Sequence, residues 1–225
     1  MNKRWMAIIL MAVFVWNMAG TDAGKRTVRA AARQTVWQKK FSQYRYDETV
    51  NQLIFVKYQK RSKAAVYMYQ KIDHKWKRIL KCKGYVGKKG INKKKEGDMK
   101  TPSGTFGFTG AFGIKKNPGA KMNYTRVNKY LYWCGDKKYY NRLIDVRKKK
   151  HRCRGEHLID YKPHYYYGMF LNYNPKHKYK KGSAIFLHCK GKKPYTAGCI
   201  AVSRKSMKKI IKNAEAGARI CIYRK

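Results

Sequence analysis

A histidine and a cysteine stand at the ends of two neighbouring apolar runs, 184–187 and 199–202. His188 follows the first run, Cys199 opens the second, and Gly198 lies directly before the cysteine. Cysteine catalysis needs a thiolate, an imidazole base to generate it, and N–H groups that hold the oxyanion. Cys199, His188 and the backbone at Gly198 could supply all three. A single Cys and His are weak evidence alone, because free cysteine is usually a buried structural residue.

The residues around this pair form a longer pattern. Between His188 and Ile200 the chain contains Thr196, one further residue, then Gly198 and Cys199. This resembles the active-site motif of the L,D-transpeptidase (YkuD-like) family, in which a strand-end His precedes a [Ser/Thr]-x-Gly-Cys-[Ile/Val] turn. The resemblance implies that Cys199 is the nucleophile and His188 its base. It also implies that the backbone amides of Gly198 and Cys199 lie near the oxyanion.

Two positions depart from the family's pattern. Ala197 stands where the family usually carries a second His, and Ala201 stands where it commonly carries an Arg. The loop between the His and the Cys is also shorter than the commonest form. The nucleophile and the base are present, whereas the family's means of recognising a substrate carboxylate is in question.

A second motif lies about a hundred residues upstream. Residues 100–106 read Lys-Thr-Pro-Ser-Gly-Thr-Phe, and the Pro-Ser-Gly part predicts a tight turn. The stretch resembles the family's K-T-P-x-G-x-[FY] segment. Two separated motifs in the family's order support the assignment more strongly than either alone.

Several other residues are candidates for substrate binding or orientation. By the family's geometry, the carbonyl of Cys189 orients the imidazole of His188, and its thiol could be a structural neighbour or a redox partner of Cys199. Glu156 could be a polar element of the pocket, but the favoured interpretation is a surface salt bridge to a Lys, since Lys is so abundant. Tyr161 is more typical of a core or rim aromatic. The binding or orienting candidates are Cys189, Thr196, Ile200, His157 and Tyr161.

The fold is predicted to be mainly β with minor α. Alternating and β-branched runs predict strands at 52–58, 64–69, 76–82, 130–134 and 218–223. Ser203 is a predicted N-cap for an amphipathic helix that carries Met207 and Ile210, with Gly217 as its C′ residue. The resemblance implies the mixed β-sandwich of the L,D-transpeptidase catalytic domain, with this helix after the catalytic Cys.

The chain is predicted to have three parts. Residues 1–23 combine a short basic start, an apolar run and small residues, which is typical of a secretory signal peptide, with an N-terminal anchor as the less favoured alternative. Residues 24–46 are a basic linker, helical around 28–38, and residues 47–225 are the catalytic domain. The mature protein is therefore expected outside the cytoplasm, at the cell wall or membrane surface.

The charge and the cysteines limit which partners and cofactors are expected. Fifty-five Lys and Arg against 11 Asp and Glu give a net charge of +44. Such a chain should adhere to anionic wall polymers or lipid headgroups; polyanion binding as the function itself is the alternative, although no nucleic-acid motif is present. No Cys/His spacing among the six cysteines resembles a zinc site, so neither a metal nor another cofactor is predicted. The oligomeric state is left open.

The expected chemistry follows from the resemblance. The cationic surroundings should lower the pKa of the Cys199 thiol, and the thiolate attacks a peptide carbonyl to form a thioester. The implied donor is a peptidoglycan stem tetrapeptide, and an amine acceptor gives a 3→3 cross-link. With water as acceptor the enzyme would be an L,D-carboxypeptidase. A non-catalytic, cationic wall-binding protein is the remaining alternative.

Overall fold

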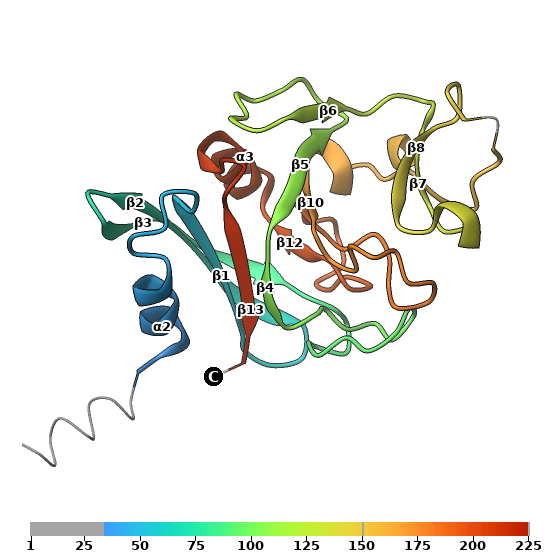
Figure 1. Cartoon of the computed structure of the whole chain (residues 1–225). Coiled ribbons are helices and arrows are strands. Elements are labelled where there is room, and N and C mark those ends of the chain that lie inside the picture. The colour runs from blue at the N-terminus through green and yellow to red at the C-terminus, as the bar shows by residue number, and fades with distance from the viewer. Residues whose placement is uncertain (1–33, 150, 225) are drawn as a thin grey trace, which may run out of the picture. The chain divides into compact units, whose positions relative to one another are not determined.

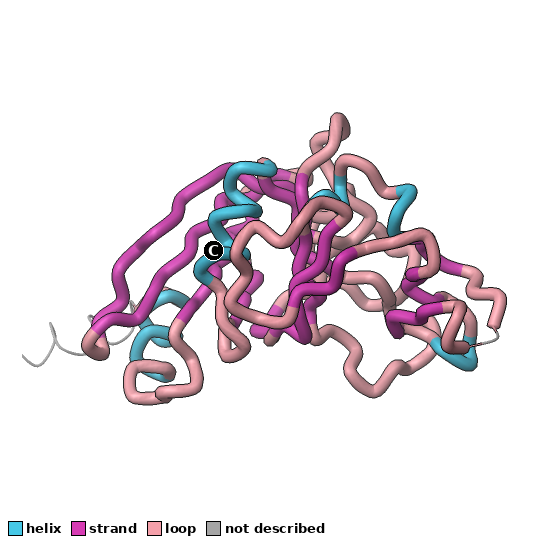
Figure 2. Tube along the Cα trace, turned by 90° about the horizontal axis from the view of Figure 1, so that it is seen from above, coloured by secondary structure: helices cyan, strands magenta, loops and turns pink. Residues whose placement is uncertain are grey.

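The computed structural model describes residues 34–149 and 151–224. The predicted signal peptide and the first part of the linker, including residues 28–33, lie outside the described residues. Within the described residues, no helix is both long and apolar enough to cross a membrane. Strands dominate the trace, and the helices are short (Figures 1 and 2).

Ten strands form one mixed sheet in the order β4–β13–β1–β2–β3–β12–β11–β10–β5–β6. The pairs β1–β13, β11–β12 and β5–β6 are parallel, and the other pairs are antiparallel. Its strands are β1 (Gln52–Tyr58), β2 (Lys63–Ile72), β3 (Lys75–Tyr85), β4 (Gly104–Phe106), β5 (Phe108–Gly113), β6 (Tyr124–Arg126), β10 (Gly168–Leu171), β11 (Phe186–Cys189), β12 (Ile200–Val202) and β13 (Arg219–Tyr223).

A smaller sheet and a few short helices complete the described chain. The second sheet has the order β8–β7–β9. Its strands are β7 (Leu131–Cys134), β8 (Arg142–Asp145) and β9 (Gly155–His157). The α-helices are α2 (Val36–Gln43) and α3 (Arg204–Asn213), and the 3-10 turns are η1 (Lys137–Tyr139), η2 (Leu158–Asp160) and η3 (His164–Tyr166).

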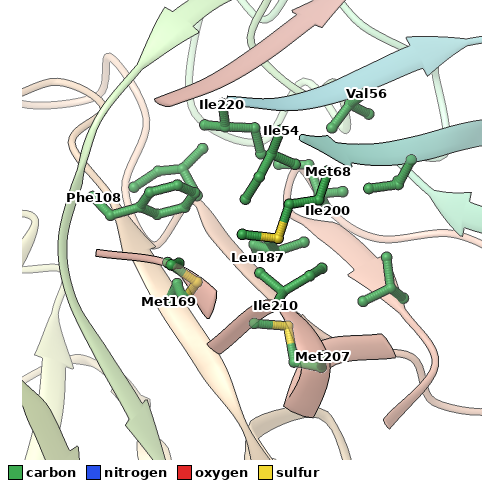
Figure 3. Close-up of a cluster of buried hydrophobic side chains, with 14 of the residues drawn as sticks. Ile54, Val56, Met68, Phe108, Met169, Leu187, Ile200, Met207, Ile210 and Ile220 are labelled. Atoms are coloured by element: carbon green, nitrogen blue, oxygen red, sulfur yellow. The ribbon is translucent and has the colours of Figure 1, made fainter. Parts of the chain in front are cut away.

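The main core lies where the curled ten-stranded sheet and α3 meet. Strand β2 alternates, so that Ala64, Val66 and Met68 are buried on one face. These residues pack in one cluster with side chains of β1, β10, β11, β12 and β13 and with Met207 and Ile210 of α3 (Figure 3). Burial of this apolar surface from both halves of the sheet is the main stabilising contribution to the fold.

Most of the predicted elements are confirmed. The predicted strand 52–58 coincides with β1, and the strands predicted at 64–69, 76–82, 130–134 and 218–223 agree with β2, β3, β7 and β13 within a few residues. The mainly β fold with the helix after the cysteine is also confirmed. Ser203 caps α3, because its Oγ accepts a hydrogen bond from the Ser206 N–H at 3.1 Å.

The predicted C-terminus of α3 was wrong. The helix ends at Asn213 and Ala214 is its C-cap, so Gly217 is not the C′ residue. Gly217 instead lies against the backbone of Thr49, where an added Cβ would be 1.5 Å from the carbonyl oxygen. Glycine is needed here because another segment approaches closely. The predicted helix around 28–38 is tested only from residue 34 onward, where the structure has the helix α2 at Val36–Gln43.

We predict that Gly217→Ala destabilises the protein by about 1–3 kcal/mol or more, the usual cost of overpacking, because the backbone of Thr49 cannot move away freely. Gly107→Ala is the matched control, since the nearest atom to its added Cβ is a side-chain nitrogen of Arg219 at 3.6 Å. Urea unfolding of the full chain measures both effects. Equal midpoints for the two variants would contradict this assignment.

Candidate active site

Strand β11 places alternate side chains on opposite faces of the sheet. Leu187 and Cys189 join the main core, whereas Phe186 points into a second, aromatic cluster that also contains Cys199. His188 shares the face of Phe186, and its ring lies 5.6 Å from that of Tyr165 between centroids. The period of two therefore puts His188 and Cys199 on the same side of the sheet.

The parallel pairing of β11 with β12 brings the two predicted catalytic residues together. Leu187 pairs with Ile200, so Cys199 stands one step before the pair, beside Phe186. The Cys199 Sγ accepts a hydrogen bond from the Phe186 N–H at 3.3 Å and donates to the Ala184 carbonyl at 3.0 Å. Both Cys199 and His188 are buried, and both line one cavity of 500 Å³.

Two threonine hydroxyls hold the backbone at the cysteine. Thr196 Oγ1 donates to the Cys199 carbonyl at 2.7 Å, and Thr101 Oγ1 donates to the same oxygen at 3.1 Å. Thr101 is fully buried and also accepts the Gly87 N–H at 2.8 Å. Thr101 belongs to the second sequence motif, yet sequence reasoning assigned it no role. The contact explains why the two distant motifs occur together.

The Gly198 amide is not placed as the resemblance implied. Its N–H donates to Thr196 Oγ1 at 3.1 Å, so it is engaged within the turn rather than available to an oxyanion. Thr196 itself lines the cavity, as expected for an orienting residue. Ile200 does not line the cavity, because its side chain is fully buried in the main core.

The carbonyl of Cys189 orients the imidazole. His188 Nδ1 lies 2.8 Å from this carbonyl, which can only accept, so Nδ1 carries the proton and Nε2 keeps its lone pair. Burial lowers the pKa of His188 to about 4, which makes the ring neutral at pH 7. The Cys189 thiol packs in the main core and donates to the Tyr167 carbonyl at 3.5 Å. It therefore lies on the opposite face of the sheet from Cys199.

The expected lowering of the Cys199 pKa was wrong. Burial and, second to it, the nearby Glu156 carboxylate raise the pKa of this thiol to about 12, although the Phe186 N–H and Lys93 oppose them. The positive charge of Lys93 is balanced by Asp98, because its ammonium lies 2.6 Å from that carboxylate. The resting pair is therefore a neutral thiol and a neutral imidazole, despite the net charge of +44.

Glu156 lies at the site and not at the surface. It lines the cavity with Cys199 and also a second, neighbouring cavity of 230 Å³ that shares the cysteine. Tyr165 donates a hydrogen bond to its Oε2, and burial raises the pKa of Glu156 to about 7. The favoured sequence interpretation, a surface salt bridge to a Lys, was therefore wrong. The scarcity of acids, 11 against 55 Lys and Arg, was the signal that could have favoured the pocket.

Of the two remaining candidates, Tyr161 lines the cavity and His157 does not. Tyr161 lines the cavity of Cys199 and His188, and its ring stacks on Tyr165 at 4.9 Å. His157 is not among the residues that line this cavity. Its two ring nitrogens face Asp160 and the Lys129 carbonyl, each at 2.8 Å. His157 is thus placed to support the loop rather than to touch a substrate.

We predict that alkylation of Cys199 by iodoacetamide is slow at neutral pH and keeps rising beyond pH 9, because only the thiolate reacts and its pKa is raised. Glu156→Gln removes a negative charge and should speed the reaction above pH 8 by about threefold or more, equal to half a pKa unit. Glu48→Gln, at an exposed position, is the control. Peptide mass spectrometry resolves Cys199 from the other cysteines, and a rate that levels off near pH 8 would contradict the raised pKa.

Comparison with solved structures found several matching chains. Bd1075 of Bdellovibrio bacteriovorus is 18% identical, with a TM-score of 0.43, over 77% of this chain and 48% of that chain. The helical cell shape determining protein Pgp2 of Campylobacter jejuni is 15% identical, with a TM-score of 0.42, over 83% of this chain and 55% of that chain. The chain thus spans about half the length of these proteins.

Comparison with curated proteins gave no match. The sequence model of the L,D-transpeptidase catalytic domain (YkuD) matches residues 75–222, which is well over half of the chain and contains both motifs. With a mainly β fold around the His188–Cys199 face, the chain belongs to the L,D-transpeptidase catalytic domain family.

Proposed function

We propose that the protein is a cysteine L,D-transpeptidase that acts on peptidoglycan stem tetrapeptides and forms 3→3 cross-links. The observation that carries the proposal is the common cavity of Cys199 and His188, in which the Cys189 carbonyl leaves Nε2 as the basic nitrogen. Family membership supports the reaction class.

The neutral resting pair determines how the first step would proceed. His188 Nε2 takes the thiol proton as the Cys199 Sγ attacks the donor carbonyl, so the thiolate forms only during attack. The tetrahedral adduct collapses, the C–N bond breaks, and the imidazolium returns its proton to the leaving amine. The product is a thioester acyl-enzyme and a free terminal amino acid.

The second step reverses this path with a new amine. Neutral His188 takes a proton from the acceptor amine, whose nitrogen attacks the thioester carbonyl, and the thiolate leaves and is reprotonated by the imidazolium. The two cavities that share Cys199 give space on two sides of the thioester. That arrangement favours an amine acceptor over water alone, so we place L,D-carboxypeptidase activity second.

The rim of the larger cavity is suited to an acidic peptide. Lys162, Lys192 and Lys193 line it, and Glu156 is the one acidic residue among its lining residues. These ammonium groups could bind the carboxylates of a stem peptide in place of the Arg that the family commonly carries where this chain has Ala201. We further propose that the protein acts outside the cytoplasm, where this substrate lies, in accord with the signal-like residues 1–23.

We predict that the full chain, incubated with disaccharide-tetrapeptide muropeptides, releases the terminal residue and yields a dimer detectable by mass spectrometry. Cys199→Ala and His188→Ala should each abolish both products, because they remove the nucleophile and the base. Cys221→Ser, which alters a buried thiol of β13, should retain activity.

The products distinguish the transpeptidase from a carboxypeptidase and from a non-catalytic polyanion-binding protein. A shortened monomer without dimer would favour the carboxypeptidase. Intact substrate with the wild-type chain over a range of salt concentrations would overturn the enzymatic proposal and leave polyanion binding as the explanation of the charge.

We also predict that Thr101→Val lowers kcat at least about tenfold, because the Cys199 carbonyl loses a hydrogen bond and the nucleophile shifts. Thr101→Ser keeps the hydroxyl and should retain most of the activity. Rates of product formation at saturating muropeptide measure both variants, with folding checked by circular dichroism. Equal activity of the Val and Ser variants would show that this hydroxyl does not position Cys199.

A further inference from the structure

A cluster of metal-binding side chains lies at the end of β7, apart from the cavity of Cys199. The ligand atoms of Cys134, His151 and Cys153 all lie within 4.8 Å of one another. Asp136 lies beside two members of this group: its Oδ2 is 3.0 Å from His151 Nε2 and 3.5 Å from the Cys134 Sγ. Cys134 and His151 approach within 3.6 Å, between Sγ and Nε2.

The separations between Cys134, His151 and Asp136 are those of ligands around one tetrahedral ion. With Zn–S of about 2.3 Å and Zn–N or Zn–O of about 2.0–2.1 Å, the sulfur and nitrogen atoms of a tetrahedron lie about 3.6 Å apart. Sulfur and oxygen also lie about 3.6 Å apart, and nitrogen and oxygen about 3.3 Å. The three distances between Cys134, His151 and Asp136 are within a few tenths of an ångström of these values. Neutral imidazole with two thiols is a donor set that selects zinc among the common divalent ions.

The backbone around the cluster is fixed independently of any ion. Cys134 pairs with Arg142 of β8 and with Gly155 of β9, so both neighbours of β7 hold it. The Gly135 N–H donates to the Arg154 carbonyl at 2.9 Å, and the Arg154 N–H donates to Asp136 Oδ2 at 2.8 Å. Cys134 and Asp136 are therefore held on a preformed scaffold, and the Arg154 N–H orients the carboxylate in the way that supporting hydrogen bonds orient metal ligands.

We propose that Cys134, His151, Cys153 and Asp136 form a structural Zn²⁺ site. Sequence spacing did not predict it, because the ligands occur as Cys-x-Asp and His-x-Cys pairs separated by residues 137–150. All four positions are occupied by the protein, which is typical of structural rather than catalytic zinc. Three anionic ligands against a doubly charged ion leave a negative centre, which is favourable in a chain with a net charge of +44.

The site would act on the segment that leads to Glu156. Cys153 and Glu156 are three residues apart, and Trp133, the neighbour of Cys134, lines the smaller cavity at Cys199. The ion would tie residues 151–153 to β7 and so hold β9, with its carboxylate, against the active-site cavities. Zinc thus stabilises one wall of the site without touching the substrate.

Zinc binding tests the proposal without reference to catalysis. The full chain is purified under reducing conditions, stripped with a chelator, and titrated with Zn²⁺ alone, with native mass spectrometry to count bound ions. One tightly bound ion is expected, and Co²⁺ in its place should give the absorption of a tetrahedral thiolate site. Cys134→Ser and Cys153→Ser should each weaken binding more than about 100-fold, since loss of mere supporting groups already costs about 10–100-fold.

The matched controls test whether other thiols bind the ion. Cys82→Ser and Cys221→Ser should bind Zn²⁺ as the wild type does. Cys199→Ala should also bind normally, which separates this site from the catalytic thiol. Binding that is lost in Cys199→Ala but kept in Cys134→Ser would overturn the proposal, as would the absence of a bound ion from the reduced wild type. A disulfide between Cys134 and Cys153 in the protein as purified would overturn it equally, because the ligands would then be consumed.

Discussion

The parallel pairing of two short strands, β11 and β12, is the constraint on which the site depends. It lies inside the ten-stranded sheet, and every residue of both strands is buried. Because the strands run in the same direction, Cys199, which directly precedes β12, lies beside Phe186, the first residue of β11, and His188 follows two residues later on the same face of β11. His188 and the turn that ends in Cys199 therefore share a face, although the loop between them is polar and contains no regular structure.

Because this strand pair is buried, desolvation also determines the pKa values of His188 and Cys199. A net charge of +44 suggests an environment that stabilises anions, yet the Cys199 thiol is less acidic than a free cysteine. Most Lys and Arg side chains are solvated, and solvent screens them from the buried sulfur, whereas desolvation acts on that sulfur directly. Lys93, the cation that does reach it, is already paired with Asp98. Local burial thus outweighs global charge.

Sequence reasoning succeeded where the signal is local. The β-branched and aromatic runs of β1 and β2, the cap at Ser203 and the Gly-Cys turn are each written within a dozen residues. It failed where residues meet only in the fold. Thr101 reaches the Cys199 carbonyl across 98 positions, and no pattern near either residue indicates that contact.

The same distinction explains the two acidic residues whose roles were not recognised. Glu156 looked like one more partner for an abundant Lys until β9 placed it beside Tyr165. Asp136 acquires its neighbours only when β7 and β9 pair. The Gly217 error has the same origin, since a close approach to Thr49 imitates the glycine of a helix end.

The position of β13 has a consequence for how the protein is made. This strand is the last element among the described residues, yet it lies inside the sheet between β4 and β1, and Leu53 pairs with Arg219. An early strand must wait for a late one before the order β4–β13–β1 can close, and such long-range parallel pairing is slow to form. During synthesis, β1 therefore presents an unsatisfied edge until β13 has been made. Until then, this edge of β1 is open to other chains and to chaperones.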